Sequence, residues 1–553
     1  MSVDGFGRSI TQVFDDYGRR TSVDDPNTGT TVFQIDPLGQ VTRMTDGRGM
    51  TTETRYDLLG RTVREIRPNS TRTWEYDHGS NGVGRIYREF SDEGLTRTFG
   101  YETYGRLSRV DYDVVNGASS EQFEVRYTYN SRSEIETFAF PKTVGGPDFQ
   151  VRYRYDDFGH LTHIEDSSAQ SLLWRWAHGG PENQVGEVEL GNGLDTQRLF
   201  NTNTGMLERL TTAAAPATPI RDVTYTWDAN RNLIQHADVR QGLTENFQYD
   251  ANNRLTTWTG THINESFSYG VDGNLRSKPG VPSLTYSSTD KPHAVREALG
   301  FQYNYDDVGN QTLRPKPVSN LPTTIEYNAF NKPTRVLGTS QDATFAYDAN
   351  QTRFRKTVDG KETLYLHDGY ERTTTPAGIV QHRMLVRSPT GPVMVVRFDG
   401  STTGSSWTRE DLYLHTDVRG SLEAVTSATG AIVERRSYTP FGERRHSDWS
   451  QTGALASPTD SNYMVGFTGH EDEYEFGWVN MDGRTYDPRL GRFMSADPLV
   501  AELYNSQNLN RFSYVFNNPM SLIDPSGFEA EPILDDRKPT ENIIIRARGG
   551  GGN

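Results

Sequence analysis

Apolar and polar residues alternate along many short segments of this chain. In the run FEVRYTY (residues 123–129), aromatic and branched apolar residues occupy every second position, with polar residues between them. Residues 149–155, 223–227 and 301–305 repeat the alternation. A period of two is the signature of a β-strand with one buried face. The pattern therefore predicts many short strands, each with an apolar and a polar face.

Most of these runs end in an aromatic residue and an Asp, with Gly or Asn two to four residues after the Asp. Clear copies begin at Tyr56-Asp57, Tyr155-Asp156, Trp227-Asp228, Tyr249-Asp250, Tyr305-Asp306 and Tyr347-Asp348, and looser copies contain Tyr17, Tyr76, Tyr104, Tyr269 and Tyr327. An Asp side chain accepts hydrogen bonds from the backbone that follows it, and Gly or Asn accepts the positive φ of a tight turn. Each copy therefore predicts a unit of strand, turn and strand.

Several neighbouring copies are about 20 residues apart, for example Tyr56 and Tyr76 or Tyr327 and Tyr347. Such a period is typical of repeat proteins. A lone two-stranded unit is marginally stable in water, whereas stacked units share one sheet and one core. Strands twist with a fixed hand, so a long sheet winds as it grows. The predicted fold class is all-β, with a spiralling antiparallel sheet.

Composition agrees with many strands and narrows the chemistry. Aromatic residues make up 11% of the 553 residues and there are 52 glycines, which suits strands joined by tight turns and argues against disorder. The formal net charge of −16 repels phosphate backbones, so we expect no nucleic-acid partner. The chain has no Cys, which excludes disulfides, thiolate catalysis and Cys-type zinc sites.

The sequence shows neither the apolar stretch of a signal peptide nor that of a membrane helix. The first 20 residues are polar, unlike a signal peptide, and apolar runs such as Val393–Val396 are far shorter than the ~18 residues of a membrane helix. We therefore expect no membrane span and no signal peptide in this chain. Export would use another route or a preceding segment.

The repeated unit resembles the YD repeat of RHS proteins, over roughly residues 1–528. The resemblance is most specific after about residue 411, where the chain is similar to the RHS repeat-associated core domain almost end to end. The motifs that carry it are YLHTDVRGS (413–421), YTPFG (438–442), FTGH (467–470), MDGRTYDP (481–488), GRFMSADP (491–498), NLNRFSYVFNNP (508–519) and DPSGF (524–528).

This resemblance implies a hollow β-shell closed by a C-terminal plug. It predicts a repeat array over residues 1–410, a core domain over residues 411–528 and a short tail over residues 529–553. The core domain of the family is an intramolecular aspartyl protease, and the matching residues here are Arg484, Asp497 and Asp524. Cleavage is implied between Phe528 and Glu529, with Phe528 in place of the usual Leu. No metal and no cofactor is implied.

The resemblance also predicts partners and a location. The implied cargo is the chain's own C-terminal toxin segment, held inside the shell. A further partner would cap the N-terminal side of the shell or belong to a secretion apparatus. The protein would be made in the bacterial cytoplasm and delivered outside the cell or to its surface. Only about 25 residues follow Phe528, which is too few for a folded toxin.

Elementary chemistry agrees with a protease built on two carboxylates. Two carboxyl groups a few ångströms apart share one proton, so one can activate water while the other donates. An Arg can orient a carboxylate, and an intramolecular substrate has a very high effective concentration. The alternative is that Asp497 and Asp524 belong to ordinary Asp-Pro turns.

Other interpretations of the whole chain remain open from sequence alone. The array could serve adhesion or carbohydrate binding at a cell surface, with Tyr-Asp pairs contacting sugars, or it could be an inactive fragment of the family. For the Tyr-Asp pairs we favour strand packing and turn capping. For His367, His382 and His415 we favour packed or surface side chains over metal ligands, because no second ligand lies at metal-binding spacing.

Overall fold

The structure is a computed structural model. It describes residues 2–3, 9–117, 119–179, 184–214, 218–315, 321–338, 342–404, 406–450, 463–498 and 506–533. The helical segments within these ranges are short 3-10 turns: η2 (Phe467–Gly469), η3 (Ser506–Leu509) and η4 (Val515–Asn517). All other regular structure in them is β. The predicted all-β fold class is confirmed.

The first sheet has 24 strands, and each strand pairs antiparallel with the next one along the chain. Its strands are β1 (Ser2–Val3), β2 (Ser9–Phe14), β3 (Arg20–Asp25), β4 (Gly29–Ile35), β5 (Val41–Thr45), β6 (Thr51–Tyr56), β7 (Thr62–Arg67), β8 (Ser70–Tyr76), β9 (Ile86–Ser91), β10 (Leu95–Tyr101), β11 (Leu107–Asn116), β12 (Ser119–Tyr129), β13 (Ile135–Lys142), β14 (Gln150–Tyr155), β15 (Leu161–Asp166), β16 (Ser171–Gly179), β17 (Val185–Leu190), β18 (Asp195–Phe200), β19 (Leu207–Ala213), β20 (Arg221–Trp227), β21 (Leu233–Asp238), β22 (Leu243–Tyr249), β23 (Leu255–Gly260) and β24 (Ile263–Ser266).

A second sheet of 13 strands follows in the same antiparallel order. Its strands are β30 (Asn304–Tyr305), β31 (Gln311–Pro315), β32 (Pro322–Tyr327), β33 (Pro333–Leu337), β34 (Ala343–Tyr347), β35 (Arg353–Val358), β36 (Lys361–His367), β37 (Tyr370–Thr374), β38 (Ile379–Ser388), β39 (Gly391–Ser401), β40 (Thr408–Thr416), β41 (Leu422–Ser427) and β42 (Ile432–Arg435). This sheet crosses residue 410, and the division of the chain at residues 410 and 528 stays a prediction.

Short sheets link the two large ones and build the C-terminal part. Their strands are β25 (Ser268–Tyr269), β26 (Leu275–Ser277), β27 (Leu284–Tyr286), β28 (Val295–Ala298), β29 (Phe301–Gln302), β43 (Ser437–Tyr438), β44 (Arg444–Arg445), β45 (Glu471–Glu473), β46 (Trp478–Met481), β47 (Arg484–Asp487), β48 (Arg492–Phe493), β49 (Leu522–Ile523) and β50 (Glu531–Pro532).

The turn between β6 and β7 shows how the repeat motif works. The Asp57 carboxylate accepts hydrogen bonds from the backbone N–H groups of Leu59 and Arg61, each at 2.9 Å. Gly60 adopts φ 80°, in the left-handed region that favours glycine. The Asp therefore closes the turn and the Gly allows its shape, as the motif predicts. We call this five-residue loop from Asp57 to Arg61, and its equivalents elsewhere, the YD turn.

The aromatic residue of the motif fastens each unit to the one before it. The hydroxyl of Tyr56 donates to the carbonyl of Val41 at 2.9 Å, and the hydroxyl of Tyr249 donates to that of Leu233 at 2.6 Å. Equivalent bonds are made by Tyr76, Tyr101, Tyr129, Tyr155, Trp227, Tyr269, Tyr286, Tyr327 and Tyr347. The interpretation of Tyr-Asp pairs as packing and turn-capping residues is therefore confirmed.

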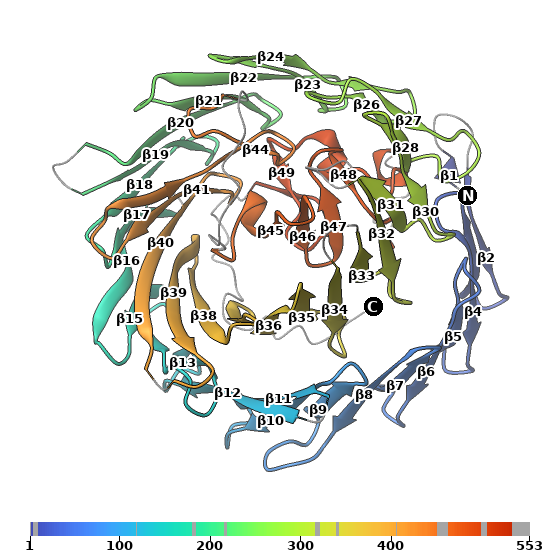
Figure 1. Ribbon diagram of the computed structural model, residues 1–553, viewed down its shortest axis with the longest axis horizontal. Helices are drawn as coiled ribbons and strands as arrows, with labels where there is room; N and C mark the ends of the chain where they lie inside the picture. Colours follow the sequence, from blue (N-terminus) through green and yellow to red (C-terminus); the bar gives the residue numbers. More distant parts are fainter. Residues whose placement is uncertain are drawn as a thin grey trace.

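The two large sheets wind into a ring. In Figure 1 the first sheet runs around the outside from blue to green, and the second continues the wind from olive to orange. Strands β45–β48, in red, lie inside the ring. The predicted spiralling shell with a C-terminal plug is confirmed.

Hydrogen bonds join the first sheet to the second along a line that we call the seam. They link residues far apart in sequence, for example 234 positions for Asn192 and Thr426 and 283 positions for Arg48 and Asn331. The pairs include Arg72 with the carbonyl of Ala349, Ser91 with the carbonyl of Tyr347, Arg355 with the carbonyl of Val115, Trp407 with the carbonyl of Gly145, and Asn192 with Thr426. At the seam, YD turns of the second sheet meet the opposite edge of the first sheet.

The apolar faces of the strands form the interior. One buried cluster joins β10–β18 of the first sheet to β35–β40 of the second, with Val125 and Met394 both fully buried. A second cluster joins β19–β29 to the C-terminal part, with Leu255 and Tyr486 both fully buried. Both the wall and the plug are therefore held by the apolar face that the period of two predicts.

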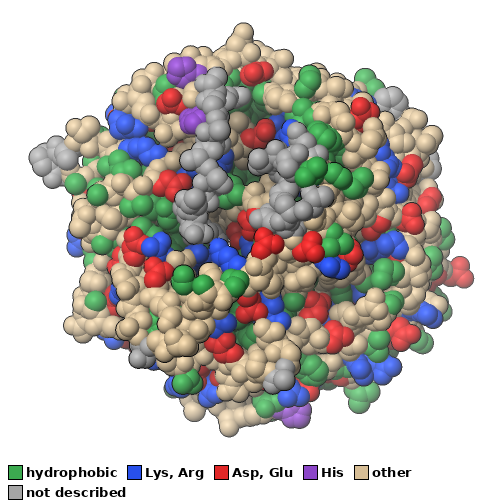
Figure 2. Space-filling view, in the orientation of Figure 1, with side chains coloured by type: hydrophobic (Ala, Val, Ile, Leu, Met, Phe, Trp, Pro, Cys, Tyr) green, Lys and Arg blue, Asp and Glu red, His purple; other side chains and the backbone are tan. Residues whose placement is uncertain are grey.

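Charged side chains of both signs are interspersed over the face shown in Figure 2. Exposed ion pairs such as Arg126 with Glu124 and Arg154 with Glu165 connect neighbouring strands or neighbouring positions of one strand. None of the described helices is long and apolar enough to cross a membrane.

Candidate active site

The predicted site residue Arg484 begins strand β47, directly after the tight turn at Asp482 and Gly483. Asp482 adopts φ 58°, and the N–H of Gly483 donates to the carbonyl of Met481. The turn directs the Arg484 side chain into the protein, where it is only 6% exposed. Its guanidinium carbon lies 3.5 Å from the centre of the Phe493 ring. A buried guanidinium requires partners of opposite charge.

Two carboxylates supply that charge. The Nη2 atom of Arg484 lies 2.9 Å from Oδ2 of Asp497 and 3.5 Å from Oδ2 of Asp524. Burial lowers the pKa of Arg484, while the two carboxylates oppose the shift. An arginine stays protonated across the accessible pH range, so the cation can hold both acids at one point.

Asp524 contacts the peptide bond at which cleavage was predicted. Its side chain is buried, and Oδ1 accepts hydrogen bonds from the N–H of Phe528 at 2.9 Å and from the N–H of Glu529 at 3.2 Å. The second of these N–H groups belongs to the Phe528–Glu529 bond itself. One carboxylate oxygen therefore lies within hydrogen-bonding distance of the nitrogen that cleavage would release.

The segment before this bond is fixed by close backbone packing. The Nε atom of Arg484 donates to the carbonyl of Gly527 at 2.5 Å. Gly527 adopts φ 75°, and a Cβ at this position would lie 2.2 Å from the carbonyl oxygen of Met481. Only glycine fits here. The Gly of the DPSGF motif thus lets the cleavage segment lie directly against the turn that carries Arg484.

The site borders an interior cavity of about 890 Å³. Its lining includes Gly483, Arg484 and Pro525 from the C-terminal part together with Tyr347 and Arg353 from the second sheet. Glu529 is exposed, whereas Phe528 is half-buried. The predicted bond therefore lies at the boundary between the packed plug and open space.

The structure brings all five predicted site residues together: Arg484, Asp497, Asp524, Phe528 and Glu529. It places Arg484 in contact with both acids, and Asp524 in contact with the bond. Their chemical roles remain predictions. Of the predicted tail, residues 529–533 are described, and residues 534–553 lie outside the described residues.

Two further residues support the site, Lys332 and Arg511, and the core-segment motifs did not predict either role. Lys332 reaches from the second sheet to the turn before Arg484, donating to the carbonyls of Asp482 and Gly483, each at 2.7 Å. Arg511 donates to the backbone carbonyl of Asp497 at 2.5 Å and to the buried carboxylate of Asp25 at 2.5 Å. The sequence carries one signal for Lys332, because its YD turn has Asn328 where the repeat has Asp.

The histidines that sequence analysis singled out are packed side chains. His382 and His415 are buried, next to Tyr370 and Thr426 respectively. Burial lowers the pKa of His382 to about 3. His367 contacts the hydroxyl of Tyr127 at 2.7 Å. In the part of the chain that the structure describes, no three His, Asp or Glu side chains are grouped to hold a metal ion.

Comparison with known proteins identifies the fold. A family model of the teneurin YD-shell matches residues 223–520, just over half of the chain. The tRNA nuclease WapA of Bacillus subtilis (strain 168) is 22% identical over 457 residues, which cover 82% of this chain and 16% of WapA. Toxin subunit YenC1 of Yersinia entomophaga is 24% identical over 434 residues, which cover 72% of this chain and 39% of YenC1.

A solved structure agrees with these sequence matches. The crystal structure of TcdB2-TccC3-TEV superposes with a TM-score of 0.78 and 16% identity, over 94% of this chain and 28% of that chain. The chain described here therefore spans less than half the length of each of these relatives. The likeness extends to nearly the whole wall and plug, so the fold is that of a YD-shell.

Proposed function

Because this chain belongs to the teneurin YD-shell family, we propose that it is a toxin-encapsulating shell that cuts its own backbone once, between Phe528 and Glu529. The observation that carries the proposal is the contact of Asp524 with the N–H of Glu529, beside an arginine that also holds Asp497. A carboxylate at the bond, with a second carboxylate beside the same arginine, supports cleavage by acid–base catalysis.

The two carboxylates have different surroundings, and we propose a different role for each. Arg484 lies nearer to Asp497, at 2.9 Å, and in the proposed mechanism Asp497 takes a proton from water. Asp524 is buried and lies farther from the guanidinium, at 3.5 Å. Its Oδ1 accepts the N–H of Glu529 at 3.2 Å and so lies beside the leaving nitrogen, and in the proposed mechanism Asp524 passes a proton shared by the two acids to that nitrogen.

Cleavage then proceeds as a hydrolysis. Water loses a proton to Asp497 and its oxygen bonds to the carbonyl carbon of Phe528. The bond from that carbon to the nitrogen of Glu529 breaks, and the nitrogen takes the proton from Asp524. The products are a carboxyl group on Phe528 and an amino group on Glu529. Arg484 holds the Gly527 carbonyl throughout, so the bond stays aligned without loss of entropy during the reaction.

Containment is the proposed purpose of the wall. The closed ring of sheets and the interior cavity beside the cleavage site can keep a C-terminal segment away from the producing cell. WapA is a tRNA nuclease and YenC1 a toxin subunit, which supports a toxin as the cargo. We propose that the protein is made in the cytoplasm and delivered outside the bacterium or to its surface.

The free edge of the first sheet suggests where a partner would cap the shell. Its YD turns expose the large apolar side chains of Leu38, Leu59, Tyr104 and Phe158. We propose that a shell-capping or secretion-apparatus protein covers this edge. The adhesion alternative is not favoured by any described contact, because the Tyr hydroxyls of the motif donate to backbone carbonyls.

The test is the intact mass of the purified full chain under denaturing conditions. Wild type is expected as two species divided between Phe528 and Glu529, and the D497N and D524N variants as one full-length species. The D57N variant, which changes a turn-capping Asp in the first sheet, is the matched control and should be cut like wild type. On native gel filtration the two wild-type pieces should elute together.

Two results would contradict the proposal. A folded wild-type chain that stays intact excludes self-cleavage and leaves a YD-repeat scaffold or adhesion module. Variants D497N and D524N that are cut as completely as wild type would show that another group does the chemistry.

A further inference from the structure

The YD turn between β32 and β33 differs from the other YD turns at the positions that carry charge. In the β6–β7 turn, Arg61 forms an ion pair with Asp57 of the same turn, at 2.7 Å. In the β22–β23 turn, Arg254 does the same with Asp250, at 2.6 Å. The β32–β33 turn has the sequence NAFNK (328–332), so Asn replaces the Asp and Lys replaces the Arg.

This double change redirects the cation. The backbone of the turn keeps the YD geometry, because the Asn328 side-chain oxygen still accepts the N–H groups of Phe330 at 2.9 Å and of Lys332 at 3.1 Å. The turn contains no carboxylate to hold Lys332. Its ammonium group instead reaches from the wall to the plug and donates to the carbonyls of Asp482 and Gly483, each at 2.7 Å.

These two carbonyls belong to the turn that sets the position of Arg484, the next residue. The same turn packs against the cleavage segment: the N–H of Gly483 donates to the carbonyl of Ser526 at 2.9 Å. A Cβ on Gly483 would lie 2.5 Å from the Phe528 ring. A displacement of this turn therefore moves the guanidinium and the residue before the bond together.

Lys332 also contacts the residue before the bond. Its Nζ atom lies 5.8 Å from the centre of the half-buried Phe528 ring, within the range of a cation–π contact. An ammonium group has three donors, and two of them are used by the carbonyls of the Arg484 turn. The single cation thus touches the turn before Arg484 and the aromatic side chain before the scissile bond.

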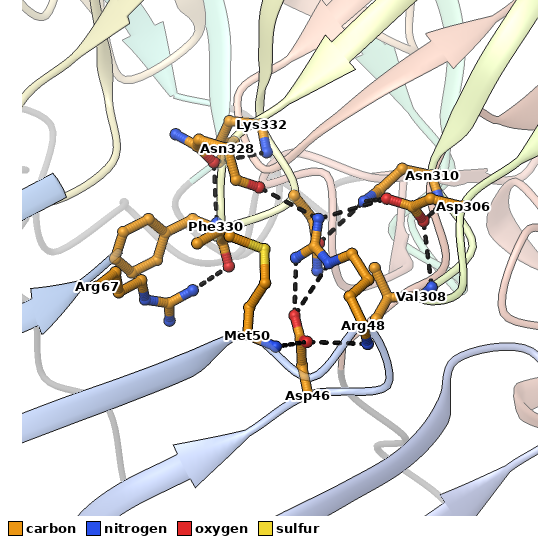
Figure 3. Close-up of polar contacts among 12 residues, drawn as sticks. Asp46, Arg48, Met50, Arg67, Asp306, Val308, Asn310, Asn328, Phe330 and Lys332 are labelled. Carbon is orange, nitrogen blue, oxygen red and sulfur yellow. Dashed lines mark hydrogen bonds and ion pairs between the residues drawn. The ribbon is translucent and has the colours of Figure 1, made fainter. Parts of the chain in front are cut away.

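On its other side the β32–β33 turn is fixed by the first sheet, as Figure 3 shows. Arg48 donates to the side-chain oxygen of Asn331 at 3.0 Å, and Arg48 is itself paired with Asp46 at 2.8 Å. Arg67 donates to the carbonyl of Ala329, and its guanidinium carbon lies 3.4 Å from the centre of the Phe330 ring. These contacts exist only when the second sheet has closed onto the first.

We propose that Lys332 is a positioning residue for self-cleavage, through which the closed wall holds the Arg484 turn against the Phe528–Glu529 bond. The inference rests on the proposed autoprotease and adds a condition to it. Cleavage is fast only after the seam has formed, because the Lys332 turn is fixed at the seam. The cut is thereby delayed until the shell that contains the released segment has wound.

The experiment follows cleavage of the full chain during cell-free synthesis. Samples taken after a short labelling pulse are denatured, and the intact mass gives the fraction divided after Phe528. K332M keeps the length of the side chain without its charge and should cut at least tenfold more slowly than wild type. K332R restores two donors and a positive charge, and should recover most of the rate.

The matched control is R106M. Arg106 occupies the same position of a YD turn in the first sheet, where it pairs with Glu102 of its own turn at 3.0 Å. We expect R106M to cut at the wild-type rate. Each substitution is also placed in the D497N background, so that thermal unfolding of uncut chains can be compared. A K332M chain with an unchanged melting temperature and slow cleavage separates positioning from a loss of stability.

Two outcomes overturn the positioning role. One is a K332M chain that cuts at the wild-type rate. The other is a folded K332R chain that cuts no faster than K332M, since the charge would then not be what matters. Both differ from failure of the proposed function itself, in which wild type stays intact or D497N is cut as fast as wild type.

Discussion

The YD turns of the first sheet and those of the second share a backbone geometry and lie in opposite surroundings. In the first sheet the tips of the turns are in solvent, with Leu59 75% exposed and Phe158 86% exposed. In the second sheet the equivalent tips are less exposed at the seam, with Val308 5% exposed and Phe330 half-buried. The motif therefore fixes the local path of the chain. The position of a turn along the spiralling sheets decides what its tip contacts.

The fifth residue of the turn differs in the same way. First-sheet turns often carry an Arg that pairs with the Asp of its own turn, as Arg61 and Arg254 do. Second-sheet turns carry Asn310, Lys332 and Thr352 at this position. Asn310 donates both to Asp306 of its own turn, at 2.8 Å, and to Asn331 of the next turn, at 3.0 Å, as Asn232 does in the first sheet. Lys332 instead donates to the plug. Among these residues, Lys332 is therefore the one that leaves the repeat and contacts the plug.

We expect the largest difference in stability when a charge is placed at a buried tip and at an exposed tip. V308D buries an unpaired carboxylate at the seam and should lower the free energy of unfolding by about 3 kcal/mol or more. F158D, at the exposed tip of the β14–β15 turn, should change it by less than about 0.5 kcal/mol. Chemical denaturation followed by tryptophan fluorescence measures both. Equal effects would show that the two sets of tips do not differ in burial.

Removing an arginine from the seam, or from an exposed turn of the first sheet, should lower the free energy of unfolding by a smaller amount. Arg48 is largely buried and joins Asp46, Asp306 and Asn331 across the seam. R48M leaves these groups without their donor and should cost about 2 kcal/mol. R61M breaks a partly exposed pair in the first sheet and should lower stability less than R48M does. Thermal unfolding of the two variants, compared with wild type, ranks them, and a larger loss for R61M would contradict the seam.

The smallest expected effect is a pH dependence at the seam. Burial raises the pKa of Glu93 from 4.5 to about 7, while the N–H of Tyr347, donating at 2.6 Å, opposes the shift. Between pH 4.5 and 7 the unfolded chain loses this proton and the folded chain keeps it, so stability falls as pH rises through that window. The carboxyl group is only partly buried, so the loss should be about 1–2 kcal/mol.

The matched variant for this test is E93Q, which keeps an acceptor for Tyr347 and removes the titration. The free energy of unfolding of wild type, measured relative to that of E93Q, should fall progressively from pH 4.5 to 7 and stay level above pH 7. A difference that is constant with pH would show that Glu93 ionises normally in the folded chain.

Local patterns were sufficient to predict the strands and turns of the wall. The alternation in residues 123–129 and the Asp57-to-Gly60 turn depend on contacts within a few residues, so their chemistry is visible in the sequence. The seam was beyond such patterns. Arg48 and Asp306 are 258 positions apart, and nothing near either residue indicates the other. The number of strands between the two edges that meet at the seam depends on the twist accumulated over the whole sheet.

The candidate site divides in the same manner. Arg484, Asp497 and Asp524 lie in motifs of the core segment, and the structure gathers them around the predicted bond. The contact from Lys332 comes from a repeat more than a hundred residues earlier, where the local trace is Asn328 in place of Asp and Lys332 in place of Arg. Departures from a repeat are thus informative about where the repeat touches something else.

The tyrosine bonds between successive hairpins set how such a wall can change in size. Each hydroxyl reaches only the hairpin before it, so the sheet itself tolerates the gain or loss of one whole hairpin at any point. The seam does not, because one added hairpin shifts every later turn against the edge it docks on. The alignment at the seam therefore restricts the number of hairpins in the first sheet. The capacity of the shell changes by whole hairpins instead of continuously.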